Sequence, residues 1–207
     1  MNLIKPKISK YLEVAKLDLS LVKNDLVDLM VCDQIIDFSI EDIEFNGCKF
    51  INVDFSKYPL KNISFIDCIF EKCNLYGSSF IEKGINRTKF DRCNMVGCDF
   101  ISCNFNDVII LNSKCDYINF SDSKMKHFMI QDTVVKEGRF VSVKLNDINF
   151  NNVDFSNCEF LNTKLQGIDF SNCDINNISV SSNDIKGIIV NETQAIMLVS
   201  LLGIIIK

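Results

Sequence analysis

Residues 45–70 read FNGCKFINVDFSKYPLKNISFIDCIF, with a large apolar residue at every fifth position. The same phase continues from Phe45 to Val190 without an inserted or deleted residue, and Ile35 and Ile40 extend it upstream. Of the 17 Phe residues, 15 lie on multiples of five, all but Phe38 and Phe128. A helix repeats near 3.6 residues and a strand near 2, so neither explains this spacing. A fixed short period predicts a repeat architecture.

A chain that turns a corner every five residues closes a four-sided coil in about twenty residues, and successive coils then stack at strand spacing, ~4.8 Å. A second inward position lies two residues before each central one. It holds small or β-branched side chains, as a crowded axis requires, for example Cys48, Val53, Cys68, Cys73, Ser78, Thr88, Cys93, Cys98 and Cys103. Two residues after the centre, Gly or Asn recurs, and both tolerate the positive φ of a tight corner.

Several five-residue units resemble the pentapeptide-repeat family: CNLYG (73–77), CNMVG (93–97), CDFIS (98–102), VDFSN (153–157) and CDINN (173–177). The resemblance covers roughly three quarters of the chain and implies an all-β fold, a right-handed quadrilateral parallel β-helix. We expect residues 1–24 to form an N-terminal cap and residues 25–190 the β-helix, with about eight coils. Residues 191–207 should form a C-terminal helix and tail. The phase is weakest at Tyr58 and Pro59, at Lys83, and over 123–138 around Phe128, where we expect bulges or altered corners.

Cysteine is abundant, at 10 residues, which could indicate disulfides. Eight of the ten, however, fall at the small inward position, where Cys acts as a small buried hydrophobe. The CxxxxC spacing is the repeat period and not a metal-ligand spacing. We therefore expect inert core thiols, with metal or redox use as the alternative. The sequence has no signal peptide and no apolar run long enough to span a bilayer, which predicts a cytoplasmic protein without a membrane partner.

The two segments before the regular repeat differ in charge. Residues 1–24 carry five basic and two acidic side chains and an apolar face, which predicts a cap over the first coil, with a targeting or nucleic-acid-binding arm as the alternative. Residues 25–44 carry seven acidic and no basic side chains. They form either a solvated face or an anionic recognition surface.

Residues 191–207 break the period and read NETQAIMLVSLLGIIIK. Asn191 or Thr193 can cap a helix that runs to about Leu202, and Gly203 suits its end. The segment is too apolar for a solvated tail and resembles the dimerisation element of pentapeptide-repeat proteins, which implies a two-fold homodimer through the C-termini. The alternative is a cap within one chain. The expected interface comprises Ile196, Leu198, Val199, Leu201, Leu202 and Ile204.

No catalytic constellation is present, and we predict neither an enzyme nor a cofactor or metal site. The single histidine, His127, falls at a turn position, where an exposed, structural role is expected. No glycine-rich phosphate loop occurs, and the many aspartates recur with the repeat. What remains is shape and charge, because a solenoid with a filled axis binds along its outer faces.

Charge is uneven along the chain. Residues 145–192 carry seven acidic and two basic side chains, next to the expected dimer axis. The candidate acidic binding surface comprises Asp147, Asp154, Glu159, Asp169, Asp174 and Asp184. The resemblance extends to the quinolone-resistance-type, topoisomerase-interacting family members, although the loops that interrupt their coils are missing here. It implies a DNA mimic that binds DNA gyrase or topoisomerase IV and modulates fluoroquinolone sensitivity, drawn to a basic channel by long-range attraction.

The alternative function is a generic protein-interaction scaffold with an unrelated partner, which the net positive charge of residues 45–144 favours. Direct nucleic-acid binding is not expected, because the pI is about 4.9 and no basic stripe is interleaved with aromatic residues.

Overall fold

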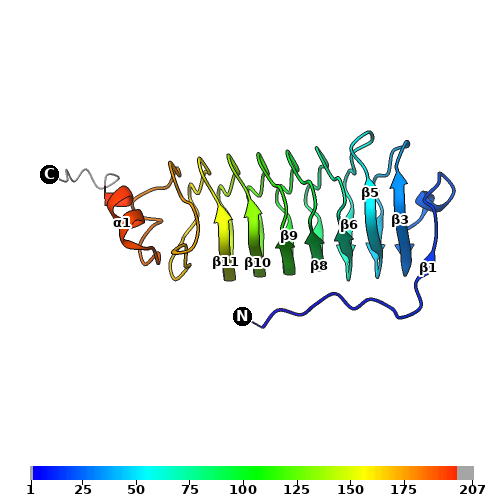
Figure 1. Cartoon of the computed structure of the whole chain (residues 1–207), viewed down its shortest axis with the longest axis horizontal. Coiled ribbons are helices and arrows are strands. Elements are labelled where there is room, and N and C mark those ends of the chain that lie inside the picture. The colour runs from blue at the N-terminus through cyan, green and yellow to red at the C-terminus, as the bar shows by residue number, and fades with distance from the viewer. Residues whose placement is uncertain (1, 200–207) are drawn as a thin grey trace.

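The chain forms a rod of stacked coils, with the N-terminal segment alongside it and a helix at the far end (Figure 1). The computed structural model describes residues 2–199. The predicted β-helix is confirmed: every strand pair is parallel, in one 11-stranded sheet. The elements are β1 (Glu13–Val14), the 3-10 turn η1 (Leu21–Lys23), β2 (Leu26–Val27), β3 (Leu29–Ile35), β4 (Glu44–Asn46), β5 (Lys49–Asp54), β6 (Ser64–Ile66), β7 (Ile69–Glu71), β8 (Gly84–Asp91), β9 (Asn104–Leu111), β10 (Lys124–Val134), β11 (Lys144–Asp154) and α1 (Glu192–Val199).

The register between strands gives the coil length. Met125 of β10 pairs with Phe105 of β9 on one side and with Leu145 of β11 on the other, an offset of twenty residues in each case. The coil has about seven turns, slightly fewer than the eight expected from residues 25–190. Four central residues per coil therefore define four sides, and equivalent positions twenty residues apart stack into columns.

The central residues fill the axis of the rod. Phe80, Phe100 and Phe120 lie one above another, with ring centroids 4.7 and 5.6 Å apart, and each is at most 1% exposed. Phe140 and Phe160 continue the same stack, 4.8 Å apart. Because aromatic rings bury a large apolar area, these stacks stabilise the coil as successive turns are added.

The small inward position carries a second role that the sequence pattern did not predict. The Cys98 thiol donates a hydrogen bond to the carbonyl oxygen of Leu75 at 3.1 Å, and the Cys103 thiol donates to that of Phe80 at 2.9 Å. The Ser123 hydroxyl donates to the Phe100 carbonyl at 2.7 Å in the same way. These side chains therefore satisfy a buried carbonyl group of the preceding coil, besides being small enough to fit.

The corners adopt positive φ, as the recurrent Gly and Asn predicted. At Gly47, φ is +66°, and an added Cβ would lie 2.2 Å from Oδ1 of Asp28, so a larger residue there requires the Asp28 side chain to move. Other corners hold residues that the pattern did not single out, such as Lys72, Arg87 and Tyr117, with φ of 55°, 43° and 58°. Asp67 and Asp107 also lie at such corners, with φ of 52° and 57°, and Asp is among the residues that adopt this backbone more readily than most.

Two expectations about the phase were wrong. Ile35 is 71% exposed, and Ile36 takes the inward place with 0% exposure. The reason is a shorter first coil, because Leu26 pairs with Phe45 and Val31 with Phe50, an offset of nineteen residues.

The stretch 123–138 contains no bulge. β10 runs through it for 11 residues with an unbroken register on both sides. Phe128 is fully buried against the rings of Phe105 and Phe120 and fits where a smaller residue was expected. Lys83, at a position where a buried small residue was expected, is only partly buried and remains accessible to solvent.

The expected distortion at Tyr58 and Pro59 is present. The Ser79 amide donates to Leu60 O, whereas the equivalent amide one coil later, that of Asp99, donates to Ser78 O. The backbone ladder is therefore displaced at the proline.

Only the second half of the N-terminal segment covers the first coil. β1 pairs in parallel with β3, and Leu17 is buried, with its backbone bound at both N and O by the Gln34 side-chain amide. Residues 2–12, named here the N-terminal arm, instead run along one edge of the rod from β1 back toward β9 (Figure 1).

Candidate binding surfaces

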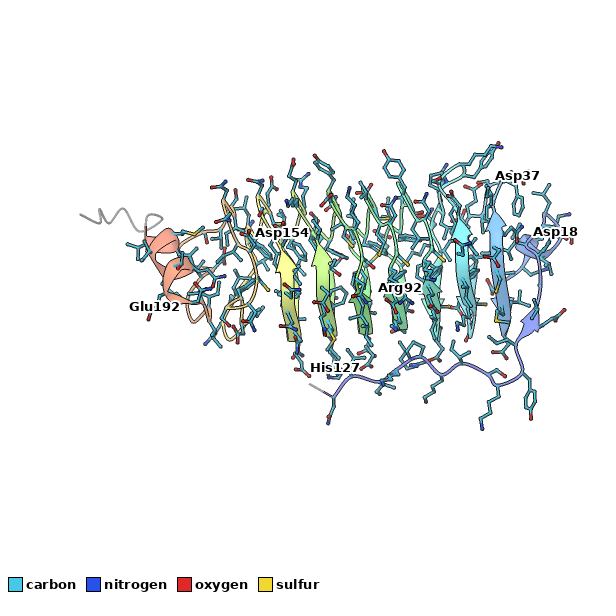
Figure 2. All side chains as sticks on the ribbon, viewed as in Figure 1. Asp18, Asp37, Arg92, His127, Asp154 and Glu192 are labelled. Atoms are coloured by element: carbon cyan, nitrogen blue, oxygen red, sulfur yellow. The ribbon has the colours of Figure 1, made fainter. Side chains whose placement is uncertain are left out.

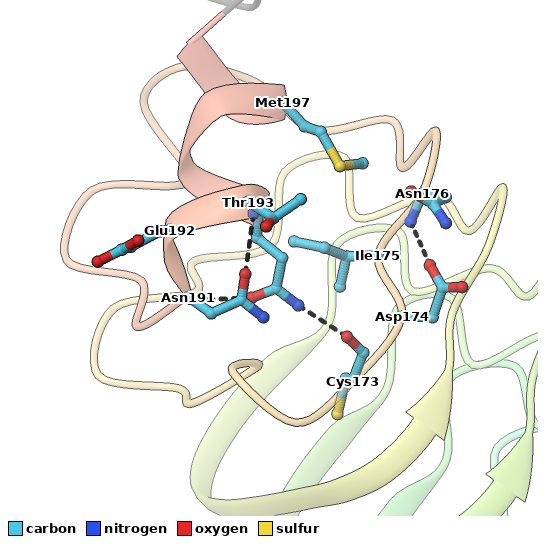
Figure 3. A pocket seen from close by; sticks show the side chains of 9 residues that line it. Cys173, Asp174, Ile175, Asn176, Asn191, Glu192, Thr193 and Met197 are labelled. Carbon is cyan, nitrogen blue, oxygen red and sulfur yellow. Dashed lines mark hydrogen bonds between the residues drawn. The ribbon is translucent and has the colours of Figure 1, made fainter.

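The filled axis leaves the outer sides as the places where this protein can bind. Among residues 2–199, no group of three or more His, Cys, Asp or Glu side chains is placed to hold a metal ion, and no helix is long and apolar enough to cross a membrane. A hollow of about 570 Å³ lies between the last coil and α1 and is open to solvent. Figure 3 shows its lining by Cys173, Asp174 and Ile175 on one side and by the start of α1 on the other.

The six acidic residues of the predicted surface do not form one patch. Asp154 and Asp174 stack in one column, as the twenty-residue spacing predicted. Glu159 lies in a column with Arg139, and Asp169 in a column with Ile189, on two other sides of the coil. Asp147 lies at a corner of β11 with φ of 53°, and Asp184 follows the last regular coil. The structure therefore places the predicted carboxylates around the rod and not on one face.

Cations neutralise two of these carboxylates. The Lys136 ammonium lies 3.1 Å from Oδ2 of Asp154, and Arg139 Nε lies 3.2 Å from Oε2 of Glu159. Burial raises the pKa of the Asp154 carboxyl, but hydrogen bonds from Ser156 and Lys136 and the charge of Lys136 outweigh it, so the pKa is lowered.

The remaining carboxylates near the C-terminal end accept hydrogen bonds from their own turns. Asp169 accepts the Ser171 amide at 2.8 Å, Asp174 the Asn176 amide at 2.9 Å, and Asp184 the Ser181 hydroxyl at 2.6 Å. None of the three forms an ion pair within residues 2–199. Asp169 and Asp184 therefore have no described counter-ion, whereas the charge of Asp174 acts on Lys136 without a direct ion pair.

Sequence reasoning missed a row of lysines. Lys124 pairs with Lys144 in adjacent strands, and Lys164 follows twenty residues later; all three are exposed, as is Lys126. They make no ion pair with another described residue. Lys144 and Lys164 also line an open hollow of about 460 Å³ with Val143 and Leu145. The signal in the sequence is the i, i+20 spacing of these three lysines.

A column of alternating charge runs along one corner. Asp67 binds Arg87 through two hydrogen bonds of 2.7 Å, and Nδ1 of His127 lies 3.1 Å from Oδ1 of Asp107. Nε2 of His127 lies 3.7 Å from Oδ2 of Asp147. Figure 2 shows His127 at the edge of the rod along which the N-terminal arm runs. His127 lies at a corner within β10, with φ of 50°, and is half-buried between two carboxylates, whereas an exposed side chain was expected.

The predicted interface residues divide into two groups. Ile196 is 57% exposed on α1, whereas Leu198 is 8% exposed and packs into the core, and Val199 is partly buried. Leu201, Leu202 and Ile204 lie outside the described residues. Within α1, Leu198 covers the coil of its own chain and Ile196 faces outward.

A filled, four-sided parallel coil built from five-residue units defines a class of protein, the β-solenoids that bind along their sides. Family models for the pentapeptide repeat region and for pentapeptide repeats in 8 copies match residues 63–140 and 139–177. Together they span more than half of the chain, and this protein belongs to the pentapeptide-repeat family.

Solved structures with low similarity include other pentapeptide-repeat proteins. A trypsin-treated variant of QnrB1, a plasmid-mediated fluoroquinolone resistance protein, is 22% identical, with a TM-score of 0.44, over 88% of this chain and 99% of that one. Full-length QnrB1 is 17% identical, with a TM-score of 0.35, over 84% and 100%. HetL of Nostoc sp. strain PCC 7120, involved in heterocyst differentiation regulation, is 10% identical, with a TM-score of 0.24, over 75% and 84%. No curated protein sequence matches this chain.

Proposed function

We propose that this protein is a non-enzymatic, cytoplasmic binding protein that acts through the outer sides of its coil. The observation that carries the proposal is the filled axis: the stack from Phe80 to Phe160 leaves no interior volume for a substrate. Binding specificity then depends on the charges displayed in columns along the rod.

The partner we propose is a type II topoisomerase, which this protein would bind as a DNA mimic and so modulate fluoroquinolone sensitivity. The support is the C-terminal half, where Asp169, Asp174 and Asp184 are held in fixed turns and form no direct ion pair with a described residue. A rod with negative charge distributed around its C-terminal coils can be drawn to a basic DNA channel by long-range attraction. Fluoroquinolone resistance is described for QnrB1, and for this chain it is part of the proposal.

We also propose that two copies associate through their C-terminal segments. The support is the exposed Ile196 on a helix at the end of the rod, followed by the apolar sequence LLGIII at 201–206. A two-fold axis at this end would bring the acidic C-terminal coils of both copies together. A purely intrachain cap is the alternative, since Leu198 already packs on its own coil.

The deciding experiment is a gyrase and topoisomerase IV activity assay with the purified full-length protein, with and without a fluoroquinolone. We expect inhibition of supercoiling or protection from the drug, and we expect Asp174→Lys to weaken either effect. The matched control is Asp37→Lys, an exposed carboxylate at the opposite end of the rod (Figure 2). No effect on either enzyme over a wide concentration range would exclude the topoisomerase proposal.

A scaffold with a different, acidic partner is the second candidate, and the row of Lys124, Lys144 and Lys164 favours it. Three like charges at strand spacing repel one another, and an anionic partner would relieve this repulsion. If the topoisomerase assays are negative, affinity capture with native protein and with Lys144→Glu/Lys164→Glu tests this reading. A partner retained by both proteins would not use the lysine row.

A further inference from the structure

The N-terminal arm is bound to the coil through its backbone. The Ile4 amide donates a hydrogen bond to Oδ1 of Asp107 at 2.9 Å, and the Lys7 amide donates to Oδ1 of Asp67 at 2.8 Å. Residues 4 and 107 are 103 positions apart in sequence, so this is a tertiary contact and not a local turn. The side chains of the arm differ in exposure: Ile4 is 51% and Tyr11 91% exposed, whereas Leu3, Pro6, Ile8 and Leu12 are partly buried.

The spacing of these two contacts matches the repeat distances of the N-terminal arm and of the coil. Asp67 and Asp107 stand two coils apart in one column, a distance of ~9.6 Å at strand spacing. Ile4 and Lys7 are three residues apart, ~10 Å in an extended chain. Every third amide of an extended peptide therefore meets a carboxylate on every second coil. Asp147 continues the column two coils beyond Asp107 at the same interval.

The carboxylates of the column are held in place before any peptide binds. Arg87 binds both oxygens of Asp67, and His127 lies beside Oδ1 of Asp107. In each carboxylate, the Oδ1 that these neighbours orient also accepts the arm amide. Burial raises the pKa of Asp67, but hydrogen bonds from Arg87 and the Lys7 backbone, with the charges of both residues, lower it overall. The site therefore favours a positively charged segment.

The arm is a weakly held occupant of this site. Residues 2–12 contain three lysines and no acidic residue, which complements the aspartates of the column. The arm forms no strand ladder with the coil before β1, and segments with few buried contacts open at low free-energy cost. Recognition through main-chain amides also tolerates many side chains, as in other modes of peptide binding.

We propose that the corner carrying Asp67 and Asp107 is a docking strip for an extended, basic peptide segment of a partner protein, which enters by displacing the N-terminal arm. The carboxylates of the strip accept hydrogen bonds from the backbone amides of every third peptide residue, and they attract positively charged side chains between those residues. This proposal does not depend on the identity of the partner proposed above.

The test uses full-length protein in which the arm can no longer donate backbone hydrogen bonds to Asp67 and Asp107. In Ile4→Pro/Lys7→Pro, both donor amides are removed and the strip is left open. The probe is a fluorescently labelled peptide with the sequence of residues 2–12, followed by anisotropy. We expect the double variant to bind the peptide at least about tenfold more tightly than the native chain, in which the arm competes. The matched control is Lys5→Pro, because the Lys5 amide makes no hydrogen bond within the described residues.

A second pair of variants locates the peptide on the strip. Adding Asp107→Gly to the double variant should weaken peptide binding by about tenfold, because an acceptor for a charge-assisted hydrogen bond is lost. Gly47, Gly167 and Gly187 occupy the same column with φ of 66–76°, so glycine preserves this corner. Asp147→Gly is the control. At one contact every three residues, the amide opposite Asp147 would be that of residue 1, which the peptide of residues 2–12 lacks.

Three results would overturn the proposal. The first is no peptide binding by the double variant while its melting temperature stays native. The second is peptide binding that Asp107→Gly leaves unchanged. The third, in the native chain, is hydrogen exchange of the Ile4 and Lys7 amides as fast as that of Lys5.

Discussion

Asn191 and Gln194 exchange two hydrogen bonds at the end of the coil. The Gln194 amide donates to Oδ1 of Asn191 at 3.0 Å, and the Asn191 amide donates to Oε1 of Gln194 at 2.9 Å. This is a capping box, and it selects Asn191 over Thr193 as the residue that begins α1. Gln194 also donates from Nε2 to the carbonyl oxygens of Phe170 at 2.9 Å and Cys173 at 2.7 Å. One side chain thus caps both the helix and the last coil.

Replacing Gln194 should therefore destabilise the C-terminal end. Gln194 is 6% exposed, and Gln194→Leu would leave the Cys173 carbonyl without its donor and the Phe170 carbonyl with the Cys173 amide alone. We expect a loss of about 1–3 kcal/mol in the free energy of unfolding, measured by chemical denaturation. Glu192→Gln is the exposed control on the same helix. Equal stability of the two variants would show that the caps contribute nothing measurable.

The aromatic stack should dominate the stability of the middle coils. Phe100→Ala removes the ring between Phe80 and Phe120, and we expect a loss of about 3–5 kcal/mol. Because each coil contacts only its neighbours, the cavity should also lower the cooperativity between the two halves of the rod. Thermal unfolding of Phe100→Ala and of the control Tyr76→Ala, which alters an exposed aromatic residue, measures both the loss of stability and the loss of cooperativity. A variant as stable as the control would contradict the role of the stack.

The period predicted the inward residues because each coil repeats the same steric requirement. It could not predict the roles of residues that break the repeat. The displacement from Ile35 to Ile36 depends on a first coil one residue shorter, which is set by pairing between Leu26 and Phe45. The N-terminal arm has no period, and its contact between Ile4 and Asp107 joins residues that only the folded coil brings together. The twenty-residue spacing of Lys124, Lys144 and Lys164 could have predicted their column. Which charges form ion pairs depends on side chains in neighbouring columns, and the period does not specify these contacts.

The core thiols should make the protein sensitive to alkali. Burial raises the pKa of Cys98 and Cys158 to about 12, from a usual value of 9.0. A raised folded pKa means that the stabilisation is complete below pH 9 and is lost as the pH rises toward 12. We expect the free energy of unfolding to fall between pH 8 and pH 10.5, by less in Cys98→Ser, which keeps the hydroxyl donor for the Leu75 carbonyl without a thiol to ionise. An identical pH dependence in both proteins would contradict this assignment.

Acid should release the N-terminal arm. The pKa of Asp67 is lowered from its usual 3.8 in the folded protein, so its stabilising contribution is present above that pH and is lost as the pH falls through the lower, folded value. We expect the Lys7 amide to remain protected from hydrogen exchange at pH 5 and to lose protection in stronger acid. In Asp67→Gly the amide should be unprotected at both pH values. Protection of Lys7 that persists in this variant would mean that the carboxylate does not hold the arm.

The exposed side chain of Ile196 allows the proposed dimer to be tested within the described helix. Ile196 is 57% exposed, so Ile196→Asp places a charge on the outer surface of α1 without entering the core that Leu198 fills. A charge in an apolar interface is costly to desolvate, and we expect the variant to sediment as a monomer under conditions in which the native chain is a dimer. Ile189→Asp, 47% exposed on the side of the last coil, is the control and should remain dimeric. If Ile196→Asp also remains dimeric, α1 serves only as a cap, with Gln194 and Leu198 closing the coil of their own chain.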